Sequence, residues 1–380
     1  MIATFIDSPA FMSAGVSFAV AFLVALAVVG TARWHLSLSA DGASGVQKFH
    51  SRPTPRIGGL ATLSGLVVVA TALASMGGAA REAAALVGVM LVVAAPAALA
   101  GFEEDITKAV SPRRRLIAAL ASGALFAVYF EAGSLLVDVQ WIHEPRLWSV
   151  TIGIGIVTIG VAGLANAVNI IDGFHGLVAG YVVMTALAIG LLAAAMGDPA
   201  LTLAALALAG AHAGFLLVNF PLGRLFLGDG GAYTSGACLA VLCVFLTVRN
   251  PDISPFVCVL LVFYPVFETL FSIWRKTRRR GHTPSQPDGV HFHMLVSRRV
   301  AGPLAARLGR TGWQNPLTGV MIWPLGVFTS AMAVASAGSG RFALAAMAVF
   351  ALVYLRLYAV MSCQARSIVA RSGLWRRSGS

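Results

Sequence analysis

The stretch VTIGIGIVTIGVAGLANAVNIIDGFHGL, Val150 to Leu177, joins two different kinds of sequence. Its first part is an apolar run, and its last twelve residues bring together two asparagines, an aspartate, a histidine and two glycines. An apolar run of about 18 or more residues is long enough to cross about 30 Å of hydrocarbon as a helix. Because polar groups are costly to bury in a membrane, those at the end of this run are interpreted as functional.

The rest of the chain repeats the apolar part of this stretch. Of 380 residues, 58% are hydrophobic and 11% are charged, and the mean hydropathy is +0.83. Such a chain lacks the polar surface of a soluble globular domain. Its apolar runs are also too long and too continuous for barrel strands, which alternate. Since only helices and closed barrels satisfy the backbone in a membrane, we predict an all-α, polytopic integral membrane protein.

The apolar runs predict about eleven transmembrane helices. They cover residues 11–32, 57–76, 82–101, 115–135, 148–168, 176–196, 199–219, 231–248, 253–273, 317–336 and 342–361. No small-residue cleavage site follows the first run, so we expect a retained helix and not a signal peptide. We predict one multi-spanning domain over residues 1–380, with residues 275–315 as a long cytoplasmic loop.

Lysine and arginine predict the orientation, because short cytoplasmic loops are enriched in them. Of the 27 such residues, 22 fall in one set of predicted loops and four in the opposite set. This places the N-terminus outside and the C-terminus in the cytoplasm. The net charge of +12 is then mainly a topology signal, with attraction to anionic membrane lipids. Nothing in the sequence indicates nucleic acid.

The predicted cytoplasmic face collects carboxylates from five separate segments, although the chain has only 15 acidic residues. They are Glu103, Glu104, Asp105, Asp172, Asp229, Glu268 and Asp288. The same face receives Lys48, His50, Asn166, Asn169, Asn219, Arg280, His291 and His293. Carboxylates and carboxamides suit a hard divalent cation, and Mg²⁺ is typically bound by one or two carboxylates plus substrate phosphates. The cluster therefore predicts a phosphate-bearing substrate.

The segment GDGG, Gly228 to Gly231, has two interpretations. Glycine turns are common between membrane helices. Glycine also lets backbone amides approach an anion at the start of a helix. An aspartate there would repel a phosphate unless a metal lies between them, which favours Asp229 as a metal ligand.

Three further features have simple explanations. The basic run WRKTRRRG, Trp274 to Gly281, is explained by the positive-inside rule, with phosphate binding as a second role. For the pair in His291 to His293, a Zn²⁺ site would need a remote third ligand, and contact with an anion explains it at least as well. The four cysteines form no CxxC motif, so we interpret them as apolar filler.

Four segments together resemble a known family. They are GFEEDITKAVSPRRRL (Gly101 to Leu116), NAVNIIDGFHGL (Asn166 to Leu177), GFLLVNFPLGRLFLGDGG (Gly214 to Gly231) and PVFETLFSIWRKTRRRGHTPSQPDGVHFH (Pro265 to His293). In order and spacing they resemble the polyprenyl-phosphate N-acetylhexosamine-1-phosphate transferases, the bacterial MraY and WecA family. The resemblance runs from about His50 to His293 and implies an MraY-like fold.

The resemblance also implies site residues. The family's paired aspartates fall on Glu104 and Asp105, its Asn-x-x-Asn-x-x-Asp-Gly motif on Asn166, Asn169, Asp172 and Gly173, and its metal-binding Gly-Asp on Asp229. Its basic, histidine-bearing loop falls on Arg279, Arg280, Asp288, His291 and His293. Two positions depart from the pattern, because Glu104 replaces an aspartate and Met294 replaces the last histidine of His-x-His-His.

The implied reaction transfers an N-acetylhexosamine 1-phosphate from a UDP-sugar, UDP-GlcNAc or a modified relative, to undecaprenyl phosphate and releases UMP. Glu104, Asp105 and Asp229 are the expected catalytic residues, and Asp229 and Asp105 the expected ligands of Mg²⁺ or Mn²⁺. Lys48, His50, Asn166, Asn169, Asp172, Asn219, Arg280, His291 and His293 are expected to bind substrate.

The expected location is a bacterial inner membrane with a cytoplasmic active site, where the product would start O-antigen, lipopolysaccharide or capsule synthesis. Two other classes remain open. A secondary transporter of an anionic solute also places polar residues at broken helices, but its site would lie near the membrane midplane. A non-catalytic scaffold of a glycan assembly complex would not need converging acids. The sequence leaves the oligomeric state open, a homodimer included.

Overall fold

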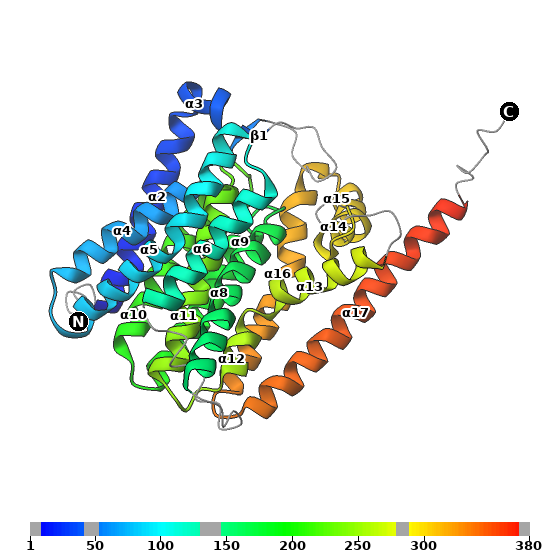
Figure 1. The fold of residues 1–380 in the computed structure, drawn as a ribbon. Coiled ribbons are helices and arrows are strands. Elements are labelled where there is room, and N and C mark those ends of the chain that lie inside the picture. The colour runs from blue at the N-terminus through cyan, green and yellow to red at the C-terminus, as the bar shows by residue number, and fades with distance from the viewer. Residues whose placement is uncertain (1–8, 42–52, 130–145, 279–288, 372–380) are drawn as a thin grey trace, which may run out of the picture.

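The structure, a computed structural model, describes residues 9–41, 53–129, 146–278 and 289–371 (Figure 1). The first half contains α2 (Pro9–Gly30), α3 (Ala32–Ser39), β1 (Ala40–Asp41), β2 (Thr54–Pro55), α4 (Gly59–Ala74), α5 (Gly78–Thr107), α6 (Pro112–Tyr129), α8 (Arg146–Ile171) and α9 (Leu177–Ala195). The second half contains α10 (Pro199–Asn219), α11 (Gly228–Arg249), α12 (Pro255–Leu261), α13 (Phe263–Thr277), α14 (Phe292–Val296), η1 (Ser297–Ala301), α15 (Gly302–Arg307), η2 (Thr311–Trp313), α16 (Gln314–Ala335) and α17 (Gly340–Arg371).

Eight helices in the described ranges are long and apolar enough to cross a membrane, namely α2, α5, α8, α9, α10, α11, α16 and α17. The pair α12 and α13 makes a ninth candidate that is bent by 77°. Helix α4 has only 16 residues, and α6 begins with three arginines, so neither belongs to this set. The all-α, polytopic fold is confirmed, and the predicted number of eleven spans is not.

Local sequence signals explain several helix ends. Asp198 accepts a hydrogen bond from the backbone amide of Leu201 at 3.0 Å, directly before a proline that opens α10. Ser254 does the same for Phe256 at 3.3 Å at the start of α12. Both are N-caps followed by proline at the first helical position, where a missing N–H costs nothing.

The bend between α12 and α13 has an identifiable cause. Pro265 lies in the first turn of α13 and cannot donate the backbone hydrogen bond that would continue α12. The Tyr181 hydroxyl of α9 donates to the carbonyl of Leu261, the last residue of α12, at 2.9 Å. The carbonyl that ends α12 is thereby satisfied inside the protein, which makes the break tolerable within a membrane.

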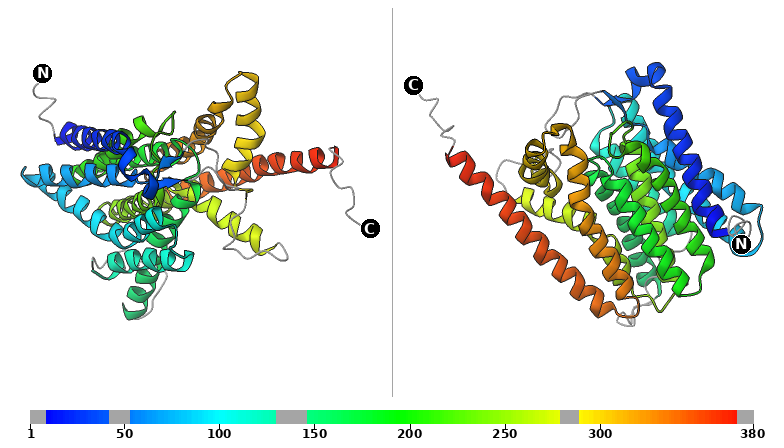
Figure 2. Two further views of the ribbon diagram at one scale, coloured as in Figure 1. Left: turned by 90° about the horizontal axis from the view of Figure 1, so that it is seen from above. Right: turned by 180° about the vertical axis from the view of Figure 1, so that it is seen from behind.

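Helix α11 is the most buried of the candidate spans and forms the centre of the bundle. Small residues bring its neighbours close: a Cβ on Gly236 would lie 2.6 Å from the Cα of Ala165 in α8, and one on Gly59 of α4 would lie 2.5 Å from the Cα of Gly231. Such close backbone contacts are typical of helix packing in membranes. Figure 2 shows α17 extending away from the bundle at its edge.

One end of the bundle carries the polar segments. Strands β1 and β2 pair antiparallel there, with Ala40 opposite Pro55, and Figure 1 shows α3, α14 and α15 at the same end. Residues 289–313 of the predicted loop 275–315 contain the four short helical segments α14, η1, α15 and η2. We call this end, where α5 ends and α11 begins, the site end.

Candidate active site

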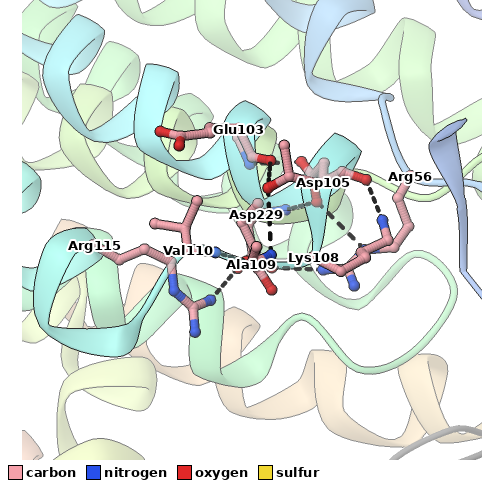
Figure 3. A network of polar contacts seen from close by, with 11 residues as sticks. Arg56, Glu103, Asp105, Lys108, Ala109, Val110, Arg115 and Asp229 are labelled. Atoms are coloured by element: carbon pink, nitrogen blue, oxygen red, sulfur yellow. Dashed lines mark hydrogen bonds and ion pairs between the residues drawn. The ribbon is translucent and has the colours of Figure 1, made fainter.

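Asp105 lies in the last turn of α5 and is completely buried. Its two carboxylate oxygens accept hydrogen bonds from the backbone amides of Asp229 and Gly230, each at 2.9 Å (Figure 3). These amides belong to the first turn of α11, which has no acceptors of its own for them and carries the positive end of the helix dipole. The anion bound by the GDGG amides is therefore a side chain of the protein itself.

Close packing accounts for the glycines of this segment. Gly228 has a φ of +77°, and a Cβ there would clash with the carbonyl oxygen of Arg56 and lie 2.5 Å from Oδ2 of Asp105. A Cβ on Gly101 of α5 would lie 2.5 Å from the backbone nitrogen of Gly230. Only glycine allows both the left-handed conformation and these approaches.

The carboxylate of Asp229 lies between two arginines from different segments (Figure 3). Arg56, which follows β2, donates from Nη2 to Oδ1 at 2.6 Å, and Arg115 of α6 pairs with Oδ2. The Nε atom of Arg56 also lies 3.4 Å from Oδ1 of Asp105. Two carboxylates and two guanidinium groups thus compensate each other in a mostly buried cluster, as buried charges require.

Glu104, the predicted partner of Asp105, is half-buried and directly precedes it in the last turn of α5. Its Oε2 atom accepts a hydrogen bond from the backbone amide of Val110 at 2.8 Å. This bond spans the connection to α6, which starts at Lys108, the C-cap of α5, in a left-handed conformation with φ of +55°. Glu104 also interacts electrostatically with Arg115, so it belongs to the same cluster as Asp229.

The connection from α8 to α9 brings the motif of the opening stretch to this cluster. Asp172 directly follows α8, and burial raises the pKa of its carboxyl from 3.8 to about 7. Arg56 opposes this rise, while the negative charges of Asp229 and Asp105 add to it. Asp172, Asp229 and Asp105, which are far apart in the sequence, therefore share one site.

The two asparagines of the motif have different surroundings. Asn166 donates to the carbonyl oxygen of Ala162 in its own helix at 2.7 Å. Asn169 lies close to Tyr233 of α11. Both are partly exposed, and their predicted contact with substrate stays a prediction.

Asn219 at the end of α10 holds two connections together. Its Oδ1 atom accepts from the backbone amide of Gly176 at 2.6 Å, and its Nδ2 atom donates to the carbonyl of Leu225 at 2.7 Å. Two residues of α16 support the same turn, because Asn315 accepts from the amide of His175 at 2.7 Å and Trp323 donates to the carbonyl of Gly176 at 3.1 Å. The structure thus gives Asn219 a role in positioning the α8–α9 connection, and substrate contact stays a prediction.

The two histidines of the HFH motif pack against that connection. The rings of His291 and His293 are stacked, with centroids 5.5 Å apart and planes within 5°. His293 is fully buried, and its Nε2 atom lies 3.7 Å from the position that a Cβ on Gly173 would take. Its ring contacts the ring of Phe174 edge-on, with the two centroids 5.7 Å apart. Nδ1 of His291 lies 2.9 Å from Oε1 of Glu268.

Three predicted site residues cannot be placed in the structure, and three residues that belong to the site or contact it were not predicted. Lys48, His50 and Arg280 lie outside the described residues. Glu268 was predicted only as one carboxylate of the cytoplasmic face, and neither Arg56, Arg115 nor Glu268 was among the predicted site residues. Arg56 lies shortly before α4 and Arg115 in SPRRRL, and both count among the basic residues that were attributed to the positive-inside pattern.

The donor set fits a hard divalent cation at Asp229 better than at Asp105. Both oxygens of Asp105 already accept backbone amides in a fully buried position. The side chain of Asp229 is 10% exposed, and its two oxygens pair with arginine side chains that would have to move aside before a cation could bind. Among the described residues, no group of three or more His, Cys, Asp or Glu side chains could hold a metal by itself, so substrate phosphates would have to complete the coordination.

These features define a polytopic membrane protein with an acid and arginine cluster at one end of its bundle. Residues 87–247 match the family model described as Glycosyl transferase family 4. This segment contains Glu104, Asp105, Asp172 and Asp229. This match over residues 87–247 and the relatives below confirm the resemblance identified from the motifs.

Curated relatives carry names of the same kind. The chain is 30% identical over 205 residues to a phospho-N-acetylmuramoyl-pentapeptide-transferase of Streptococcus pneumoniae, covering 51% of this chain and 60% of the relative. It is 31% identical over 281 residues to a decaprenyl-phosphate N-acetylglucosaminephosphotransferase of Mycobacterium tuberculosis, covering 64% and 65%. It is 27% identical over 290 residues to a probable undecaprenyl-phosphate N-acetylglucosaminyl 1-phosphate transferase of Bacillus subtilis, covering 73% and 75%. The alignments to the first two span less than two thirds of each relative.

Proposed function

We propose that this protein transfers an N-acetylhexosamine 1-phosphate from a UDP-sugar to undecaprenyl phosphate and releases UMP. The observation that carries the proposal is the position of Asp229, which lies within the family match at the start of α11 and between Arg56 and Arg115. Two of the relatives are named for N-acetylglucosamine phosphate transfer to a polyprenyl phosphate. UDP-GlcNAc is therefore the first substrate to test.

The reaction joins two anions. An oxygen of the lipid phosphate attacks the phosphorus atom that carries the sugar, and the bond from this phosphorus to the UMP oxygen breaks. UMP leaves with the electron pair, so no covalent enzyme intermediate is needed. Catalysis of such a step depends on positioning and on compensating negative charge.

The chain's own residues supply both effects in this proposal. Arg56 and Arg115 bring two positive charges to the site and can donate to phosphate oxygens. Asp105 accepts a hydrogen bond from the backbone amide of Asp229 and so fixes the position from which the Asp229 side chain extends. Glu104 is the candidate for orienting the lipid phosphate or accepting its proton. Because that phosphate is largely ionised at neutral pH, orientation is the larger contribution of Glu104 to the reaction.

Mg²⁺ or Mn²⁺ would be held by Asp229 with substrate phosphates, and when bound it would neutralise the diphosphate and stabilise the departing UMP. Asp105 was the second ligand expected from the sequence. Its two amide contacts make a positioning role the better proposal.

The proposed setting is a bacterial inner membrane, with the site end in the cytoplasm and the N-terminus outside. The basic residues near this end, such as Arg113 and Arg114, support that orientation. The product would be a lipid-linked sugar pyrophosphate that starts a cell-surface glycan, either O-antigen and lipopolysaccharide or capsule.

A panel of UDP-sugars offered to membranes that contain the protein tests the substrate. We expect a GlcNAc pyrophosphoryl lipid by mass spectrometry, and no product in matched membranes that lack the protein. A lipid product with another sugar would revise the substrate, and no sugar-bearing lipid from any donor would exclude the transferase in favour of a transporter or a scaffold.

A further inference from the structure

Glu268 is a charged residue in a membrane helix that the proposed reaction does not use. It lies in α13, after the bend, and is 1% exposed. A buried carboxylate in such a place is costly unless it is hydrogen bonded, so its partners indicate its role.

Three donors converge on this carboxylate. Oε1 lies 2.9 Å from Nδ1 of His291 and 3.2 Å from the backbone nitrogen of Phe292, and Oε2 accepts from the hydroxyl of Tyr354 in α17. An ionised carboxylate can only accept, so this contact with an ionised Glu268 requires a proton on Nδ1 of His291. This fixes the orientation of the imidazole ring, as carboxylates do for functional histidines in other sites.

The contacts continue beyond His291 toward the proposed active site. His291 stacks on His293, and His293 packs against Gly173 and Phe174, directly after Asp172. A continuous series of contacts thus runs from α17 through α13 to the α8–α9 connection. We call the series Tyr354, Glu268, His291 and His293 the buried relay.

We propose that Glu268 is a positioning residue that holds the two imidazoles of the HFH motif against the Asp172–Gly173 turn and so shapes the nucleotide-sugar side of the site. Helix α13 follows the bend after α12, and α17 lies at the edge of the bundle. The buried relay therefore connects α13 and α17 to the α8–α9 connection at the site. This role rests on the proposed function for its effect on the reaction but not for its effect on the structure.

The variant Glu268→Gln keeps the size of the side chain and removes its charge. A hydrogen bond to a charged group contributes enough that its loss corresponds to about a tenfold effect or more. We expect the KM for UDP-GlcNAc to rise about tenfold, with kcat and the KM for undecaprenyl phosphate changed less than about twofold. Asp198→Asn is the matched control, because Asp198 is also a buried helix-associated carboxylate but pairs with Arg249; both KM values should stay as in the wild type.

A double-mutant cycle tests whether Glu268 acts through His291. If it does, Glu268→Gln combined with His291→Ala should raise the KM for UDP-GlcNAc no further than His291→Ala alone. Multiplied effects would overturn the proposal, as would an equal rise in both KM values for Glu268→Gln.

Backbone hydrogen–deuterium exchange separates this proposal from the proposed function, because it needs no substrate. In Glu268→Gln, exchange should accelerate in residues 289–296 and also in residues 171–177, whereas Asp198→Asn should leave both segments unchanged. Unchanged exchange in residues 171–177 of Glu268→Gln would overturn the positioning role even in an active enzyme. Accelerated exchange in a protein that transfers no sugar would support the role while the proposed function fails.

Discussion

Replacing Asp105 with asparagine tests how the site is built. The carboxylate accepts two backbone amides of α11 at 2.9 Å and lies 3.4 Å from Nε of Arg56. Asparagine keeps one acceptor oxygen and turns an NH₂ group toward the other amide. The unsatisfied buried amide costs about 1 to 3 kcal/mol, and the lost charge at the helix N-terminus costs about 0.3 to 2 kcal/mol.

Together these effects predict that Asp105→Asn lowers the free energy of unfolding by about 1 to 5 kcal/mol. Relief of the buried charge offsets part of this loss, so the lower half of the range is expected. Equilibrium unfolding in detergent micelles measures it. Because Asp229 loses its backbone anchor, sugar-phosphate transfer should fall with the stability.

Glu103→Gln is the matched control on the same helix. Glu103 pairs with Arg114 at 3.3 Å, but the two side chains are 45% and 64% exposed. Such exposed pairs contribute about 0 to 1 kcal/mol, so this variant should unfold almost as the wild type does. Equal losses in Asp105→Asn and Glu103→Gln, or no loss in either, would refute the capping role of Asp105.

Three further outcomes are expected. Burial raises the pKa of Asp172 from 3.8 to about 7, so between these values the metal-free folded protein keeps a proton that the unfolded chain releases. The free energy of unfolding should therefore fall as the pH rises from about 4 to about 7, and Asp172→Asn should reduce this fall. Equal slopes of unfolding free energy against pH in the wild type and in Asp172→Asn would contradict the burial of this carboxyl. In a cysteine-free background, a membrane-impermeant maleimide should label D252C in intact cells and A109C only after permeabilisation, and the reverse would overturn the orientation. Activity should persist without the four cysteines and vanish in excess EDTA, so full activity with EDTA would exclude a metal requirement.

The sequence predicted the fold class because hydrophobic length depends on the chain alone. The sequence did not predict that the apolar runs differ in length and straightness. The pair α12 and α13 bends by 77°, and α4 has only 16 residues. The sequence also predicted that the acids at positions 105, 172 and 229 gather at one end, and they share one electrostatic cluster in the structure.

The roles within that cluster needed three-dimensional contacts. Nothing in the local sequence indicates that Asp105 accepts the amides of GDGG, because the two segments are 124 and 125 residues apart. Arg56 and Arg115 carry the same sequence signal as any topogenic arginine, and only their convergence on Asp229 distinguishes them. Glu268 lies 23 residues before His291 and 86 residues before Tyr354 in the sequence, so helical periodicity could not predict these contacts.

Release of UMP from radiolabelled UDP-GlcNAc by the purified protein, with and without undecaprenyl phosphate and Mg²⁺, tests the proposed reaction itself. We expect release only when the lipid phosphate and the metal are both present. Release should fall about 10²-fold or more in Asp229→Asn, because this carboxylate would hold the metal and pairs with both arginines of the site. Release without the lipid phosphate, or near-normal release by an Asp229→Asn protein that unfolds like the wild type, would contradict the proposed reaction.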